Sequence, residues 1–478
     1  MAFGILSIVL SLAVIYFAAI GVQATVTKYR EFRAIELVRD FLKYALLFTS
    51  VLLTCLGLSG LLGLWLDIDN VDYYGKLDAA RWSAFLVVGI PVIAVIVRWI
   101  RRDFRRDLQA SESPAWQIYL FAAATSSLVI WFVPLNVTLR WFAGEAYRPR
   151  ELAQAIVAFA VWIVHVFLIR KHSSVISNMH RFAGLASGIT ASAVGSIGAI
   201  GYGISKWMNV ATGKYELQNN LILLIIGAPV ALYYWSNLDY HGSTLEVRIY
   251  RTFAGKVIPT VFAAFAATFA LGSTLNWYFG EHINDAPRYF THVPQQIATV
   301  IVLVPLVLYF RYLVSEFSEH GRDDITRIFQ YLVSGAALIG ASVAGGWFIA
   351  GLLEFNSFVN TSISGFSGLM VALPIWRFEW RHCEHAIHYE FESEHNSPIR
   401  RFFLYLMIAA PTIASFASAV SLSYIFFKGL FVGGFEWIDI KAAFGALVSA
   451  ALVAIYQYRV FKSEQDGVTK RKMTLAVR

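Results

Sequence analysis

Long apolar runs, separated by short polar segments, dominate the amino-acid sequence. An α-helix needs about 20 apolar residues to cross a bilayer, and most of these runs approach or exceed that length. The first run is Phe3–Thr25, and twelve more follow it in pairs. The pattern therefore predicts an all-α integral membrane protein with about 13 transmembrane helices, in which one N-terminal helix precedes six two-helix hairpins.

The paired runs define the hairpins. They are Phe41–Leu66 with Trp82–Ile100, Ile118–Phe142 with Leu152–Ile169, Phe182–Met208 with Leu221–Leu238, Val257–Phe279 with Ile297–Phe317, Phe329–Phe355 with Gly365–Trp376, and Phe402–Phe431 with Ile438–Phe461. The run Gly365–Trp376 is too short to cross a bilayer alone. We expect it to span only if its helix begins near Ser362 and continues past Arg377.

A two-helix unit returns the chain to the same side of the membrane, so the six hairpins would be parallel repeats. We divide the chain into an N-terminal helix with its linker (1–38), hairpins at 39–113, 114–180, 181–247, 248–326, 327–399 and 400–465, and a basic cytoplasmic tail (466–478). Inverted repeats, which let one transporter half rock against the other, need an odd number of helices per unit. Six parallel hairpins can form a ring, an arc or a bundle, and the sequence leaves these alternatives open.

Recurring aromatic residues support the repeat. Tryptophan ends the first helix of four hairpins, at Trp65, Trp141, Trp207 and Trp277. Tyrosine opens four first helices, at Tyr44, Tyr119, Tyr331 and Tyr405. Because tryptophan is enriched at membrane–water interfaces, we interpret the four tryptophans as interfacial anchors.

Proline recurs within the second helix of four hairpins, at Pro91, Pro229, Pro305 and Pro374, and is missing there from the second and sixth hairpins. Each proline removes one backbone donor and can kink its helix. We interpret the four as helix-kink prolines; a break at a gate or binding site is the alternative.

Charge indicates the orientation. The net charge is +8. Lysine and arginine favour the odd-numbered helix connections and the C-terminal tail over the even-numbered connections, by nearly three to one, and these basic segments are the inner ones if the N-terminus is outside. Cytoplasmic loops are the basic ones, so we predict an N-terminus outside and a cytoplasmic C-terminus. No basic residue precedes the run Phe3–Thr25, which favours a retained helix over a signal cleaved near Ala24.

Composition agrees with the membrane class, since 58% of the residues are hydrophobic and 15% are charged, against about 25% charged in soluble domains. Because the charges lie between apolar runs, the bilayer is the expected partner and nucleic acid is not. The basic run Arg98–Arg106 could bind anionic lipid at the cytoplasmic face, although orientation alone accounts for it. Glycines crowd the segments Gly184–Gly201 and Gly335–Gly346, which predicts close helix packing, with a hinge lining a cavity as the alternative.

Groups that carry chemistry are sparse. No Asp or Glu lies in the middle of a predicted span, which disfavours ion-coupled transport. We expect His165 to be a satisfied packing residue, with a proton or ligand role as the alternative. The segment Arg377–His395 is rich in His and Glu; we expect a solvated helix extension, with a metal or pH-sensing site as the alternative. The two cysteines, Cys55 and Cys383, are not expected to pair. We predict no catalytic, cofactor-binding or metal-binding residue.

A basic–aromatic segment opens two of the hairpins. Its copies are Arg39-Asp40-Phe41-Leu42-Lys43-Tyr44 and Arg400-Arg401-Phe402-Phe403-Leu404-Tyr405. With the recurring tryptophan and the arginines that end second helices (Arg98, Arg311, Arg377), these segments resemble a prokaryotic multi-pass membrane family of unknown function built of tandem transmembrane hairpins. The resemblance covers roughly residues 30–465. It implies an architecture and no catalytic or binding residue.

These observations favour a non-enzymatic structural or accessory subunit of the prokaryotic cytoplasmic membrane, assembled with other membrane proteins. The alternative is a channel or uncoupled transporter for a small solute. A membrane enzyme comes third, because no nucleophile, acid pair or metal-ligand set stands out.

Overall fold

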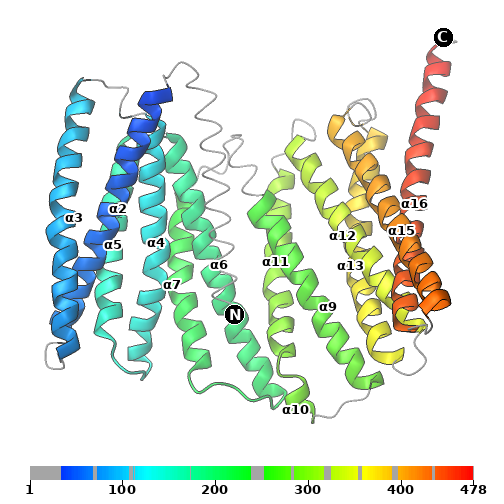
Figure 1. The fold of residues 1–478 in the computed structure, drawn as a ribbon, viewed down its shortest axis with the longest axis horizontal. Helices are drawn as coiled ribbons and strands as arrows, with labels where there is room; N and C mark the ends of the chain where they lie inside the picture. The colour runs from blue at the N-terminus through cyan, green and yellow to red at the C-terminus, as the bar shows by residue number, and fades with distance from the viewer. Residues whose placement is uncertain are drawn as a thin grey trace. The chain divides into compact units, whose positions relative to one another are not determined.

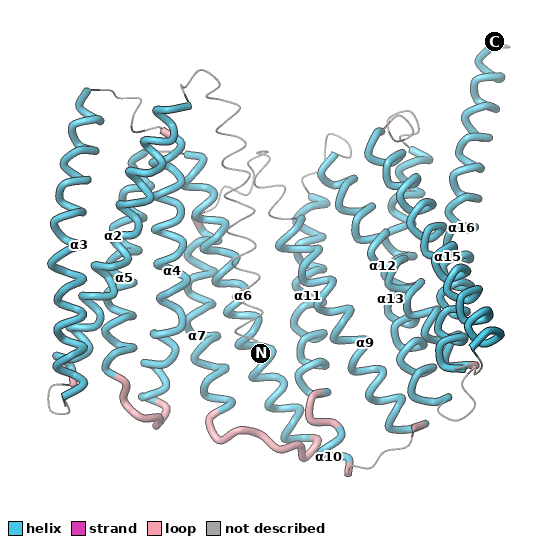
Figure 2. Tube along the Cα trace, viewed as in Figure 1, coloured by secondary structure: helices cyan, strands magenta, loops and turns pink. Residues whose placement is uncertain are grey.

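The computed structural model describes residues 34–67, 73–106, 111, 113–172, 174–237, 252–280, 285–316, 324–353, 358–389, 394, 397–432 and 437–476. The predicted first helix, Phe3–Thr25, lies outside these residues. Figure 2 shows that long helices make up nearly all of the described chain. Contacts between Cα atoms divide the chain into two units, the first comprising 1–199 with 213–240 and the second 200–212 with 241–478.

Helices α2 to α7 contain the described residues of unit 1 (Figure 1). They are α2 (Ala34–Leu66), α3 (Tyr73–Arg106), α4 (Pro114–Phe142), α5 (Pro149–His172), α6 (Ser174–Trp207) and α7 (Glu216–Ser236). The last turns of α6, from Ile200, group with unit 2. Short connections join α2 to α3, α4 to α5 and α6 to α7, as the hairpin prediction requires.

Unit 2 contains the later helices. They are the short π-helix η3 (Phe253–Val257), α9 (Ile258–Phe279), α10 (Ala286–Tyr289), α11 (Val293–Glu316), α12 (Asp324–Leu352), α13 (Phe358–Tyr389), α15 (Pro398–Val432) and α16 (Trp437–Ala476). The helix α16 continues to Ala476, so most of the predicted tail is helical.

Eleven of the described helical segments are long and apolar enough to cross a membrane. They correspond to eleven of the predicted runs, so the architecture is that of a multi-pass membrane protein. The remaining run of the six hairpins, Gly365–Trp376, lies within α13, a helix of 32 residues that is not among the eleven. This helix begins before Ser362 and extends past Arg377, which is the condition that the sequence analysis set for a span.

Each unit contains a four-helix block with the same pattern of helix pairing. In unit 1, α2 packs against α3 and α5 and touches α4, and α4 packs against α5. In unit 2, α12 packs against α13 and α16 and touches α15, and α15 packs against α16. Both α4 and α15 begin with a Ser-Pro pair, at Ser113-Pro114 and Ser397-Pro398. The two blocks therefore share helix order and pairing, whereas the sixfold hairpin repeat stays a prediction.

Glycine allows helices α6 and α7 to approach each other closely. A Cβ atom added to Gly195 would lie 2.6 Å from the backbone nitrogen of Leu224, and one added to Gly227 would lie 2.6 Å from that of Ser192. Such distances leave no room for a side chain at these two positions. The predicted packing role of the glycine-rich segment is thus confirmed, and its physical basis is dispersion contact between backbones.

We expect Gly195→Ala to lower the free energy of unfolding by about 1–3 kcal/mol, because the new methyl group would collide with the α7 backbone. Thermal unfolding of the purified protein in detergent, followed by tryptophan fluorescence, measures the change. Gly203→Ala in the same helix is the control, since nothing lies within 4 Å of its added Cβ. Equal stability of the two variants would contradict the packing argument.

Candidate functional site: a basic cavity and two buried polar clusters

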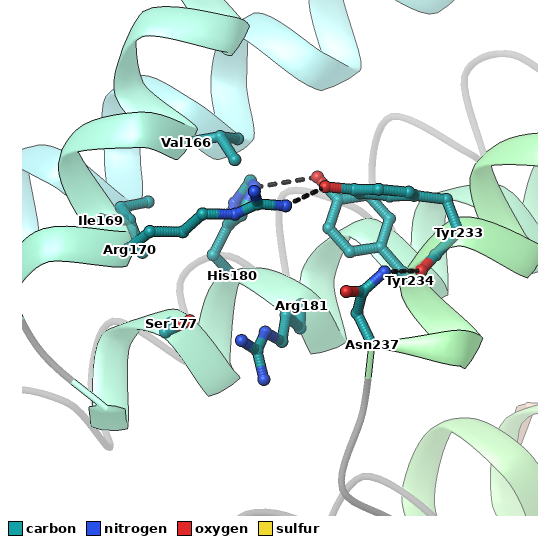
Figure 3. Close-up of a pocket in the computed structure, with 9 residues that line it drawn as sticks. All are labelled: Val166, Ile169, Arg170, Ser177, His180, Arg181, Tyr233, Tyr234 and Asn237. Atoms are coloured by element: carbon teal, nitrogen blue, oxygen red, sulfur yellow. Dashed lines mark hydrogen bonds between the residues drawn. The ribbon is translucent and has the colours of Figure 1, made fainter.

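A cavity of about 190 Å³ lies in unit 1 among α5, α6 and α7. Its lining residues, drawn in Figure 3, are Val166, Ile169, Arg170, Ser177, His180, Arg181, Tyr233, Tyr234 and Asn237. Polar and charged side chains form most of this wall, although the three helices are mainly apolar. The cavity is therefore the candidate functional site of unit 1.

His180 bridges three helices at the cavity wall. Its side chain is buried (2% exposed), with Nε2 2.9 Å from the Tyr234 hydroxyl and Nδ1 3.3 Å from Thr125 Oγ1. The Trp162 indole N–H donates to the Tyr234 oxygen over 3.0 Å. We assign the Tyr234 hydroxyl hydrogen to His180 Nε2, which leaves the Nδ1–H of a neutral ring for Thr125. The cluster thereby ties α6 to α4, α5 and α7.

His165 on α5 belongs to a second hydrogen-bonded set in the same unit. Its Nδ1 lies 2.8 Å from the Val161 carbonyl, which can only accept, so this nitrogen carries the hydrogen. Its Nε2 then accepts from the Tyr119 hydroxyl at 2.9 Å. Both ring nitrogens of this buried residue are engaged, as we expected of a satisfied packing residue.

Two guanidinium groups line the cavity without a carboxylate partner. Arg170 donates to the Tyr233 hydroxyl, and within the described part of the chain neither Arg170 nor Arg181 forms an ion pair. The only acidic residues in α5, α6 and α7 are Glu151 and Glu216, in the first turns of α5 and α7. Arg170 lies near the last turn of α5 and Tyr233 in that of α7, so the acidic residues of these helices stand at the opposite helix ends from the cavity.

A buried ion-pair network occupies the corresponding block of unit 2. The Arg400 side chain (residue 1% exposed) reaches Glu464 on α16, with Nε 3.2 Å from Oε2, and also donates to the Tyr331 hydroxyl. Tyr331 donates to Glu394 over 3.1 Å, and Arg327 Nε donates to the same carboxylate over 2.8 Å. Glu394 has no exposed surface. The network joins α12, α15 and α16 to the segment before α15.

Further ion pairs connect neighbouring helices. Arg311 on α11 pairs with the buried Glu379 on α13. Lys43 on α2 lies 2.9 Å from Asp103 on α3. Asp103 lies beyond the predicted run Trp82–Ile100, and Glu379 lies beyond the predicted run Gly365–Trp376, which agrees with the absence of acidic residues from the middle of the predicted spans. In an apolar setting a paired charge costs far less than an isolated one.

The expectation of a solvated extension at Arg377–His395 is wrong for part of the segment. The helix α13 continues to Tyr389, but Trp380, Cys383 and Glu394 are buried. The reason is that Trp380 and Cys383 pack in one apolar cluster with side chains from α12 and α15. Among the described residues no three His, Cys, Asp or Glu side chains are placed to share a metal ion, and residues 390–393 and 395 of the segment lie outside the description. Neither Cys55 nor Cys383 forms a disulfide.

The four predicted anchor tryptophans lie within the last turn of their helices. Trp65, Trp141 and Trp207 are exposed on α2, α4 and α6, whereas Trp277 on α9 packs against the rings of Tyr289 and Phe290. These positions suit interfacial anchoring, which stays a prediction.

The four predicted prolines lie inside the second helices α3, α7, α11 and α13, and none of them lines the cavity. Two more, Pro134 and Pro411, lie inside α4 and α15, the first helices of the hairpins that lack a second-helix proline. Their role as kinks stays a prediction.

Sequence reasoning singled out Tyr119, Tyr331 and Arg400 as features of hairpin starts, but it did not predict which side chains they contact. It did not single out His180, Tyr234 or Glu464. The available signal was the recurrence of tyrosine near helix starts, because a buried hydroxyl needs a polar partner. Nothing in the spacing indicates that the partner lies 46 to 69 residues away.

Comparison with known proteins gives one similarity. A family described as a domain of unknown function, DUF5671, matches residues 40–169 and 356–456. The first match covers most of α2 to α5, and the second covers α13, α15 and most of the α16 span, so each falls within one four-helix block. The match confirms the resemblance to a family of unknown function. The prokaryotic origin and the tandem hairpins that the resemblance implies stay predictions. No curated protein and no solved structure matches the chain.

We expect Tyr234→Phe to lower the free energy of unfolding by about 1–3 kcal/mol, because His180 Nε2 and the Trp162 N–H would lose their partner in a buried site. Thermal unfolding measures this loss. Tyr278→Phe is the matched control, since that tyrosine is 75% exposed. If both variants unfold at the wild-type temperature, the cluster does not stabilise unit 1.

The Arg400–Glu464 pair allows a double-mutant cycle. Glu464→Met alone should cost about 3–5 kcal/mol, because it leaves the buried Arg400 without its carboxylate. Arg400→Met should cost less, because the carboxylate that it leaves, Glu464, is only half-buried. The double variant should lose much less than the sum of the two. Asp78→Asn breaks an exposed pair with Arg81 and should change stability by no more than about 1 kcal/mol. Additive losses in the cycle would show that the two side chains act independently.

Proposed function

We propose that the protein is a non-enzymatic structural or accessory subunit of a prokaryotic cytoplasmic membrane, with its N-terminus outside and its C-terminus in the cytoplasm. Its partners are the bilayer and at least one other membrane protein. The observation that carries the proposal is that two buried histidines, His165 and His180, and three paired carboxylates, Glu379, Glu394 and Glu464, are all engaged in contacts between elements of the protein.

A catalytic residue must be able to exchange its hydrogen bonds with a substrate. Both ring nitrogens of His165 and of His180 are already bonded to groups of the protein. The buried carboxylates Glu379 and Glu394 and the half-buried Glu464 are each paired with an arginine. Such saturated clusters make helix packing specific at the cost of chemical freedom, and this supports a structural role.

Helix α15 supplies the surface for a partner. It packs against α16 on one side, and the remaining surface exposes a row of large side chains at intervals of three or four residues: Ile413, Phe416, Val420, Tyr424 and Phe427. The small residues Ala414, Ala417 and Ser421 are exposed among them. Small residues let two helix backbones approach, and this drives association in lipid, where leucine and acyl chains are equally apolar. We propose that a transmembrane helix of another membrane protein docks here.

Photo-crosslinking in intact cells tests this role. A crosslinking amino acid at position 416 should capture one membrane protein, whereas the same group at Val87, an exposed position on α3, should not. Ala417→Leu should abolish the crosslink because it blocks close approach, and Ala94→Leu on α3 should not.

Two results would count against the subunit role. One is crosslinking to lipid alone at both positions, together with purification of the protein as a lone monomer. The other is solute flux in proteoliposomes of the purified protein above that of empty vesicles, which would favour the channel or uncoupled transporter.

A further inference from the structure

We infer that the cavity among α5, α6 and α7 binds the phosphate group of an anionic ligand, with Arg170 and Arg181 as its charged contacts. This site is independent of the proposed subunit role, because a scaffold and a channel could equally carry it.

Charge balance is the first argument. Elsewhere the partly or fully buried guanidiniums of Arg311, Arg327 and Arg400 are each paired with a carboxylate. At the cavity, Arg170 contacts only a tyrosine hydroxyl, and Arg181 has no acidic partner among the described residues. Arg181 is half-buried and Arg170 is exposed, so both guanidiniums can reach a negatively charged occupant of the cavity, which would balance their charge.

The donor set is the second argument. Guanidinium groups present several N–H donors in a planar fork that matches phosphate oxygens. Ser177 lines the same cavity, is buried, and within the described residues its hydroxyl has no hydrogen-bond partner. Figure 3 shows Arg170, His180 and Tyr233 converging on the cavity from three helices. The site thus offers two guanidiniums and the Ser177 hydroxyl, and none of its described lining residues is a carboxylate that would repel an anion.

Size restricts what can enter. The cavity holds about 190 Å³, or about six waters at about 30 Å³ each. Pockets for drug-sized molecules are about 300–1,000 Å³. One small anionic group fits, and the rest of a larger ligand must extend out of the opening.

The position indicates the level of the site in the membrane. Arg170 ends one candidate span, Ser177 begins the next and Ser236 ends a third. The cavity therefore lies where three spans end, at the depth of phospholipid headgroups, on the side that charge predicts to be cytoplasmic. A lipid phosphate and a free phosphate ion share the required chemistry.

Native mass spectrometry of the full-length protein in detergent tests the site. The protein should retain phosphatidylglycerol over phosphatidylcholine, and Arg170→Gln with Arg181→Gln should weaken this binding at least about tenfold, since each charge-assisted contact is worth that much. Arg459→Gln with Lys462→Gln, two exposed basic residues on α16, is the control and should bind like the wild type.

A second arm distinguishes the two phosphate sources. Isothermal titration with inorganic phosphate should show binding that the cavity variant loses if the ligand is soluble. Phosphatidylglycerol binding that phosphate does not displace identifies a lipid site. Unchanged binding of both probes in the cavity variant overturns the proposal. If the double variant unfolds, Arg181→Gln alone replaces it, and unchanged binding there has the same consequence.

Discussion

A polar group surrounded by apolar side chains and lipid must find its partner within the protein, and the described structure depends on this constraint. Transfer of an unpaired hydroxyl or amide from water costs several kcal/mol, and of an unpaired charge far more. The buried Arg400 is hydrogen-bonded to Glu464 and Tyr331, and the buried His180 is hydrogen-bonded to Tyr234 and Thr125. Each of these contacts joins side chains that lie 54 to 69 residues apart on different helices, so satisfying the polar groups also positions the helices.

The two four-helix blocks apply different chemistry to the same pairing of helices. In unit 1, α4 is joined to α5 by a neutral hydrogen bond between the Tyr119 hydroxyl and His165. In unit 2 the equivalent helices α15 and α16 are joined by the ion pair of Arg400 with Glu464. One family of unknown function matches parts of both blocks. The helix pairing is thus common to both, whereas the polar contacts are particular to each and are where their roles can differ.

The cavity of unit 1 departs from this rule of internal pairing. Its histidine and tyrosines are bonded to the protein, but Arg170 and Arg181 find no carboxylate among the described residues. Two arginines without a carboxylate among the described residues suit the anion site that we propose here, because the occupant would supply the missing charge. The neighbouring clusters then hold the helices that position these cations.

The sequence by itself determined the membrane class, eleven of the described helices and the pairing of neighbours into hairpins, because apolar runs of spanning length have few alternatives in a bilayer. It also indicated, through Gly184–Gly201, where helices approach closely. Only the tertiary structure decided which polar residues meet. His180 and Tyr234 are 54 residues apart, and Glu394, expected in solvent, is fully buried. The reason is that hydrophobic patterning specifies which segments enter the membrane, whereas contacts between helices depend on rotations and packing that no local pattern encodes.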